Sequence, residues 1–256
     1  MSDLHGDYDF AKIYSFDDSN LTKDDYLIIC GDFGCIWNHK GEDSREYVLL
    51  EELNSKNYTT LFVDGNHECH PRLANDFPVR QWKGGKIHAI RDSVFHLMRG
   101  QVFTIGGKKI FTMGGAASHD IQFRREGISW WREEIPCKAE RIEAIENLKK
   151  HDFKVDYIIT HDCPESICRE NIEKMWRSIG NSREPHEYNK WLESVADAVE
   201  FKRWYYGHWH INMDSDNDKF TCLYYDILPI GSNVKDNVKI RLKPLNDRMK
   251  LKRLNK

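Results

Sequence analysis

The sequence has no paired cysteine motif, no strong net charge and no long apolar run. Its seven cysteines are odd in number and form no CxxC pair, which disfavours a disulfide framework and a thiolate zinc site and indicates a reducing compartment. Apolar runs such as YLIIC are far shorter than the roughly 20 residues of a membrane-spanning helix. No charged and then apolar leader opens the chain. We therefore expect a cytoplasmic protein without a membrane partner.

Composition and overall charge do not indicate a particular partner. The chain has 256 residues, 40% hydrophobic and 31% charged, and a net charge of −3, which is ordinary for a globular protein. Because no linker rich in proline, glycine or serine divides it, we expect residues 1–256 to form a single domain. Only Lys239 to Lys256 is biased, with eight Lys or Arg against the single Asp247. This stretch is either a solvated last strand and tail or an arm that binds nucleic acid.

Short apolar runs alternate with amphipathic stretches along much of the chain. The runs lack strict alternation, which is typical of strands covered on both faces. They lie at Tyr26–Gly34, Thr59–Glu68, Asp156–Pro164 and Arg203–His210. Helical spacing of apolar residues predicts helices within 42–57 and 138–150, whereas residues 86–118 predict consecutive antiparallel strands with Gly turns. The pattern indicates an α/β protein with an antiparallel insertion.

Residues that can bind a metal follow these strands. Ligands bind beyond the carboxyl ends of strands in open α/β sheets, and four of five polar motifs occupy such positions, while the fifth opens the chain. The candidate residues of the five motifs are Asp3, His5, Asp32, Asn66, His67, His161, His208 and His210. Carboxylate mixed with imidazole suits Mn, Fe or Zn. Seven ligands and one further histidine are too many for a single catalytic ion, and they suit two ions that share a carboxylate.

In this order, the motifs resemble the signature of the calcineurin-like metallophosphoesterases. The resemblance implies a four-layer α/β/β/α sandwich and hydrolysis of a phosphomonoester or phosphodiester. The chemistry would use a hydroxide that bridges two divalent ions, with Mn²⁺ favoured and Fe or Zn as alternatives. His67 would donate a proton to the leaving oxygen. The implied ligand sets are Asp3, His5 and His210 for one ion and Asn66, His161 and His208 for the other, with Asp32 between them.

One departure from the family pattern concerns the partner of His67. The family often reads GDxxD, in which the second aspartate orients this histidine, and Cys35 stands at that place here. A thiol cannot hold an imidazolium as a carboxylate does. Asp64 and Glu68 are the carboxylates nearest in sequence, and the pattern does not decide between them.

A second departure lies at the start of the sequence. Family members have an apolar strand that runs into D-x-H, whereas only Met1 and Ser2 precede Asp3 here. We therefore expect the first strand of the sheet to be missing. The alternative is a true start at which other contacts hold Asp3 in place against the entropy of a free terminus.

The segment GGAASHDIQFRREGISWWREEIP also resembles a stretch in a bacterial and phage-borne branch of the family. Arg124 and Arg125 either bind the substrate phosphate, for which guanidinium groups are suited, or pair with nearby glutamates. Trp130 and Trp131 either stack on a base or, in the interpretation that we favour, belong to the core.

Three functions stay open at this stage. A phosphoesterase that acts on a small or exposed phosphoester is favoured. A nuclease is supported only by the basic stretch 239–256, and a non-catalytic metal-binding scaffold with the same fold is a rival of another class. Scaffold relatives usually lose ligands or the GNH histidine, and this chain has all of them. The oligomeric state is not predicted.

Overall fold

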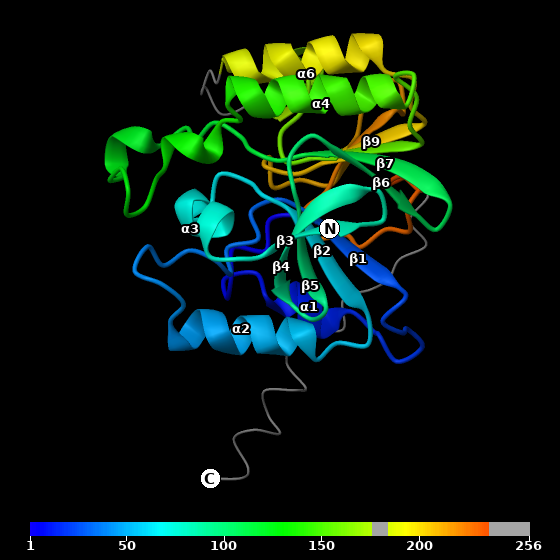
Figure 1. Ribbon diagram of the computed structural model, residues 1–256. Coiled ribbons are helices and arrows are strands. Elements are labelled where there is room, and N and C mark those ends of the chain that lie inside the picture. Colours follow the sequence, from blue (N-terminus) through cyan, green and yellow to red (C-terminus); the bar gives the residue numbers. More distant parts are fainter. Residues whose placement is uncertain (176–183, 236–256) are drawn as a thin grey trace.

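The computed structural model describes residues 1–175 and 184–235, which form two β-sheets packed face to face with helices outside both (Figure 1). The strands are β1 Tyr26–Cys30, β2 Thr59–Val63, β3 Val79–Trp82, β4 Gly85–Arg91, β5 Val94–Leu97, β6 Gln101–Ile105, β7 Lys108–Met113, β8 Tyr157–Thr160, β9 Arg203–Tyr206, β10 Met213–Asp214 and β11 Phe220–Cys222. The helices are α1 Ala11–Ser15, α2 Ser44–Asn54, α3 His70–Asn75, α4 Lys138–Lys150, α5 Glu165–Met175 and α6 Glu187–Ala198. The order is β1-β2-β5-β4-β3 in the first sheet and β10-β11-β9-β8-β7-β6 in the second.

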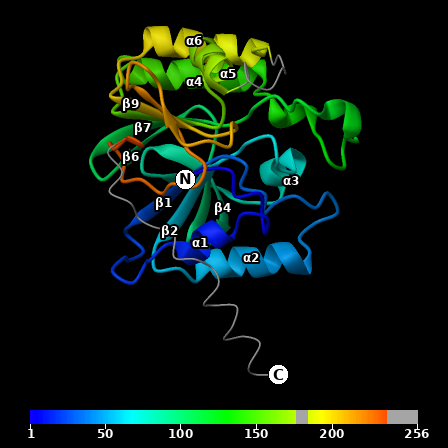
Figure 2. The same ribbon diagram turned by 180° about the vertical axis from the view of Figure 1, so that it is seen from behind.

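The layers follow from three apolar clusters. Leu61 of the first sheet and Ile159 of the second belong to the central cluster between the sheets. Leu50 of α2 is buried in a second cluster over the outer face of the first sheet. Leu148 of α4 and Leu192 of α6 are buried in the third, over the second sheet. Figure 2, seen from behind, shows α5 beside α4 and α6. The structure confirms the predicted four-layer α/β/β/α sandwich.

The predicted helices within 42–57 and 138–150 are confirmed as α2 and α4. α2 begins after Asp43, whose carboxylate accepts the amides of Arg45 and Glu46 and so caps the helix. None of the helices in the described ranges combines the length and the apolar character needed to cross a bilayer.

Residues 86–118 form consecutive strands as predicted, but they divide between the two sheets. β4 pairs antiparallel with β3 and β5, and β6 pairs antiparallel with β7. Each of these pairs is joined to the rest of its sheet by a parallel pairing, β5 with β2 in the first sheet and β7 with β8 in the second. The predicted antiparallel pairing is confirmed for β4 with β5 and for β6 with β7, whereas the prediction of one antiparallel insertion is wrong, because β5 and β6 lie in different sheets. Gly100 precedes β6 with φ 71° and lies so close to Ala144 of α4 that a Cβ there would collide with its backbone.

The first residues of the chain are held against β1. The carbonyl of Met1 accepts the amide of Cys30 at 2.9 Å. The buried ammonium group of Lys12 donates to the carbonyls of Ser2 at 3.1 Å and Asp3 at 2.8 Å. Burial lowers the pKa of Lys12 to about 8 against the opposing effect of nearby aspartates. These contacts hold Asp3 in place. That a first strand of the sheet is missing stays a prediction.

We predict that Lys12→Met lowers the free energy of unfolding by about 1–3 kcal/mol, because two backbone carbonyls lose their buried donor. Urea denaturation measures the change, and Lys40→Met, at an exposed position, is the control. Equal stability of the two variants would show that Lys12 does not anchor residues 1–3.

Candidate metal centre and cleft

The predicted ligand residues come together where strands of both sheets end. Asp32 follows β1 and Asn66 follows β2 in the first sheet. His161 directly follows β8, and His208 follows β9, in the second sheet. The candidate site therefore lies at the shared carboxyl edge of the sandwich, as expected from the positions of the motifs.

The side chains form two groups whose possible ligand atoms lie within 4.8 Å of one another. Asp32 belongs to both groups. The first group is Asp3, His5, Asp32 and His210, and the second is Asp32, His161 and His208. The structure thus brings together carboxylate and imidazole donors that suit a divalent transition metal. Whether each binds an ion stays a prediction.

Two buried polar atoms in the site fit a cation. Among the described residues, Oδ1 of Asn66 and Nε2 of His161 are buried and have no hydrogen-bond partner. Nδ2 of Asn66 donates to Oγ of Ser118 at 3.1 Å. Because this hydrogen bond fixes the amide group, it also fixes the direction in which the amide oxygen points. Nε2 of His161 lies 3.1 Å from Oδ1 of Asp32 without a hydrogen bond. Because unpartnered buried acceptors are costly, the two atoms match the needs of a bound divalent ion.

Outer contacts orient two of the histidines. Nδ1 of His161 lies 2.8 Å from the carbonyl of Cys30, so it is the protonated nitrogen that donates there. Nδ1 of His5 lies 3.1 Å from the carboxylate of Asp9, and its Nε2 lies 3.2 Å from Asp32. Such partners on the far nitrogen fix the tautomer and direct Nε2 into a metal site.

Asp3 joins the N-terminus to the loop after β9. Its carboxylate accepts the amide of His208 with both oxygens at 3.1 Å. Nε2 of His210 lies 3.3 Å from Asp3, and the ring of His210 stacks on Tyr224 with centroids 4.7 Å apart. A Cβ at Gly207 would overlap the Asp3 carboxylate, so this position requires glycine.

The ligand loops have an uncommon backbone geometry. Asp3, His5, Asp32, His208 and His210 have φ of 56°, 48°, 46°, 67° and 52°. Residues other than glycine adopt this left-handed region at an energetic cost and are concentrated at functional sites. Surrounding contacts offset this conformational cost at all five positions. They therefore hold the backbone of the loops in the conformation that presents these five side chains.

The charges of the site depend on one another. Burial alone lowers the pKa of His5, but the carboxylate of Asp32 outweighs it and raises this pKa to about 9. The pKa of His161 rises to about 10 for the same reason. Burial raises the pKa of Asp32, but His161 and His67 hold it well below its usual range. The buried carboxylate of Asp32 and the imidazole rings near it thus favour one another's charged forms.

Both carboxylates suggested as partners for His67 have other roles. Glu68 accepts the backbone amides of Phe33 and Gly65 and so joins the loops after β1 and β2. Burial, with the nearby aspartates, raises the pKa of Glu68 to about 8. Asp64 accepts from Arg99 at 2.6 Å and contacts two buried histidines. The ring of His67 is instead stacked on an aromatic neighbour.

That neighbour is Trp37, which sequence reasoning did not select. The centroids of Trp37 and His67 lie 5.6 Å apart at an interplanar angle of 27°. Trp131 packs edge-on against Trp37 at 5.3 Å and is 3% exposed, which confirms the core interpretation for this tryptophan. The only signal for Trp37 in the sequence is its place in GDFGCIW, five residues after Asp32.

A cleft of about 620 Å³ opens beside the candidate metal ligands. Its lining includes His5, His67 and His210 from the site and Trp37 and Arg45 from the first half of the chain. Further along the chain, it also includes His119 and Arg124. Arg125 is exposed and does not line the cleft. The basic stretch 239–256 lies outside the described residues.

The comparison with protein families decides the class of the chain. A family model described as calcineurin-like phosphoesterase matches residues 1–212. The chain belongs to this family. Calcineurin-like phosphoesterases are generally metal-dependent phosphoester hydrolases, and this one contains a candidate metal site. That residues 1–256 form a single domain stays a prediction.

Comparison with individual proteins adds little to this assignment. A solved structure of a phosphopantetheinyl hydrolase from Mycobacterium tuberculosis is similar over 88% of this chain and 88% of its own, with 15% identity and a TM-score of 0.44. No curated protein matches the chain.

We predict that Asp32→Asn loses both equivalents of Mn²⁺, because Asp32 belongs to both ligand groups. His210→Ala, which removes a member of one group, should retain one equivalent. The metal content after loading and desalting, measured by mass spectrometry, tests this, with exposed His39→Ala as the control. Full metal content in Asp32→Asn would contradict the shared role of Asp32.

Proposed function

We propose that this calcineurin-like phosphoesterase is a dinuclear metal-dependent hydrolase of phosphomonoesters or phosphodiesters. The observation that carries the proposal is the presence of Asp32 in both groups of possible ligands. The proposed ligands are Asp3, His5, Asp32, Asn66, His161, His208 and His210. Two divalent ions, Mn²⁺ or else Fe or Zn, would supply Lewis-acid stabilisation of phosphoryl charge and an activated water.

His67 is the proposed proton donor to the leaving oxygen. It lines the cleft, and its Nε2 lies 4.0 Å from the carboxylate of Asp32. Its ring contacts His5 edge-on with centroids 5.2 Å apart, so it lies beside the first ligand group. Burial lowers the pKa of His67, with Asp32 as the main opposing influence. A histidine that reaches the site and the cleft together suits general acid catalysis at an ester oxygen.

Arg124 is the proposed contact to the substrate phosphate. It lines the cleft, and its positive charge contributes to the lowered pKa of His67, which indicates proximity. Asp120 accepts from Nε of Arg124 at 2.6 Å and so orients the guanidinium group. Because Arg125 does not line the cleft, the proposal keeps Arg124 alone.

The cleft volume supports an ester with an organic group larger than a bare phosphate, since clefts of this size hold drug-sized ligands. The two rival functions lack comparable support. The stretch behind the nuclease hypothesis lies outside the described residues, and a metal-binding scaffold gives no account of the cleft that His67 and Arg124 line beside the ligands.

Hydrolysis of nitrophenyl phosphate and of bis-nitrophenyl phosphate tests the proposal directly. Chelator-treated protein refilled with Mn²⁺ should hydrolyse at least one of them, and His67→Ala should lower kcat by about 10²–10⁴-fold. His39→Ala is the matched control at an exposed histidine. Absence of metal-dependent turnover in the intact chain, or full activity in His67→Ala, would refute the proposal.

A second prediction concerns Trp37 as the residue that positions His67. We expect Trp37→Leu to lower kcat by about 10–100-fold, because a small displacement of a catalytic group has effects of this size. Trp37→Phe, which retains a stacking ring, should restore most of the activity. In the background of His67→Ala, Trp37→Leu should have no further effect on kcat. Equal losses with and without His67 would show that Trp37 acts in another way.

A further inference from the structure

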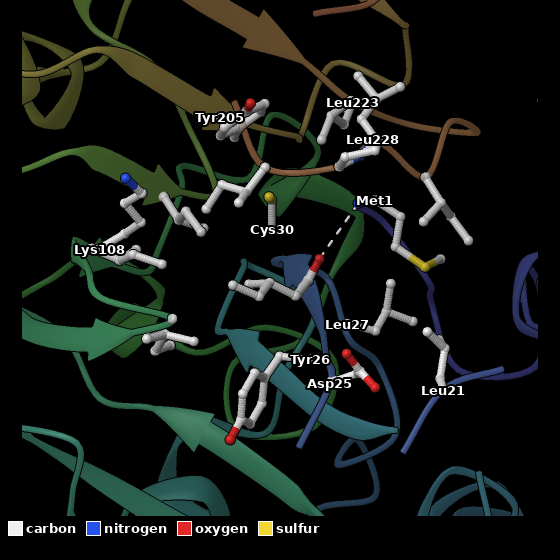
Figure 3. Close-up of a pocket in the computed structure, with 18 of the residues that line it drawn as sticks. Met1, Leu21, Asp25, Tyr26, Leu27, Cys30, Lys108, Tyr205, Leu223 and Leu228 are labelled. Carbon is white, nitrogen blue, oxygen red and sulfur yellow. Dashed lines mark hydrogen bonds between the residues drawn. The ribbon is translucent and has the colours of Figure 1, made fainter. Parts of the chain in front are cut away.

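The two buried atoms that fit a cation, Nε2 of His161 and Oδ1 of Asn66, are oriented by contacts of different kinds. Nδ1 of His161 lies 2.8 Å from the backbone carbonyl of Cys30, and a carbonyl only accepts, so the direction of this hydrogen bond is fixed. The side chain of Cys30 faces a separate, mostly apolar cavity of about 870 Å³ (Figure 3), which shares no lining residue with the cleft. Asn66 depends instead on a polar side chain.

The hydroxyl of Ser118 is that partner, and a hydroxyl can both accept and donate. In the structure it accepts from Nδ2 of Asn66 at 3.1 Å. The oxygen and the NH₂ group of an amide are similar in shape, so hydrogen bonding has to decide which way the amide is turned. If the hydroxyl donated to Asn66 instead, the amide would turn over and its NH₂ group, which is no metal ligand, would face the site. The direction of the Ser118 proton therefore decides whether Asn66 can bind an ion.

The proton of the Ser118 hydroxyl is directed to Glu134. Oγ of Ser118 donates to Oε2 of Glu134 at 2.6 Å, and the backbone amide of Ser118 donates to Oε1 at 2.8 Å. Glu134 is 3% exposed; burial raises its pKa, and the two donors of Ser118 oppose this shift. An ionised carboxylate has acceptors only. With Glu134 as its acceptor, the hydroxyl is left to accept from Asn66.

The backbone at Glu134 is held in place independently of this chain of hydrogen bonds. Nη2 of Arg99 donates to the carbonyls of Glu133 at 2.8 Å and Glu134 at 3.4 Å. The same nitrogen donates to the carboxylate of Asp64 at 2.6 Å. Asp64 directly follows β2 and lies two residues before Asn66. Arg99 thus fixes the backbone that carries Glu134 relative to the loop that carries Asn66.

We propose that Glu134 is a positioning residue of the metal centre, which acts through Ser118 to keep the amide oxygen of Asn66 turned toward the second ion. This inference rests on the proposed function, because it takes Asn66 as a ligand of that ion. Its effect is expected in the affinity for metal. Segment 114–136 would then serve the metal centre as well as the substrate contact proposed for Arg124.

Glu134→Gln tests the direction of the hydrogen bonds with little change of shape. The new NH₂ group can donate to the Ser118 hydroxyl, which then donates to Asn66 and turns the amide over. Calorimetric titration of the chelator-treated chain with Mn²⁺ should show two ions on the unaltered chain. In Glu134→Gln, the Kd of one ion should rise by about 10–100-fold, the usual effect of losing a partner of a metal ligand. Glu133→Gln, the same change at the exposed neighbouring position, is the control.

Substitutions at Ser118 test the hydroxyl itself. Ser118→Ala removes both the acceptor of Asn66 and the donor to Glu134, so it should weaken the same ion. Ser118→Thr retains the hydroxyl and should bind both ions as the unaltered chain does. Equal Mn²⁺ affinity in Ser118→Ala and Ser118→Thr would contradict the inference.

A double variant separates the orientation of Asn66 from a general loosening of the fold. In Asn66→Asp, either oxygen of the introduced carboxylate can face the ion, so adding Glu134→Gln should leave both Kd values unchanged. An equal loss of affinity in both backgrounds would overturn the inference. Unchanged affinity in Glu134→Gln alone would overturn it and leave the proposed function standing. Fewer than two Mn²⁺ ions on the unaltered chain would overturn both.

Discussion

The buried carboxylate of Asp32 is the interaction on which the rest of the site depends. Asp32 is 1% exposed, and burial of an uncompensated carboxylate would be very costly. Its Oδ1 accepts the amides of Asn66 and His67 at 2.9 Å each, and its two oxygens lie close to His5 and His161. These partners come from the N-terminus, from the loop after β2 and from the end of β8. One charge therefore joins segments from both sheets at a single point.

The surrounding contacts make this convergence rigid. Glu68 ties the loop after β1 to the loop after β2, and Lys12 ties the N-terminus to its own helix. Asp3 in turn accepts the amide of His208 from the loop after β9. Left-handed φ values at Asp3, Asp32 and His208 are tolerated because these contacts outweigh their cost. These contacts within the protein fix where the candidate ligands lie.

Much of the fold follows from local sequence, and the predictions that failed concern contacts between segments far apart in the chain. The helices α2 and α4 and the strands that precede the motifs were predictable, because periodicity and strand-end polar residues are local signals. The division of residues 86–118 between two sheets was not, since it depends on which distant strands accept β5 and β7. In the same way, the spacing of Asp64 and Glu68 from His67 suggested a partner, but Arg99 and backbone amides engage them instead. The stacking of Trp37 on His67 joins residues 30 positions apart, and its only local signal is the place of Trp37 five residues after Asp32.

Anomalous diffraction from crystals grown with Mn²⁺ tests the central claim most directly. The account predicts two anomalous peaks, one on each side of the Asp32 carboxylate, the first near Asp3, His5 and His210 and the second near His161 and His208. A single peak, or peaks that do not contact Asp32, would contradict the account of a shared carboxylate at the centre of this phosphoesterase.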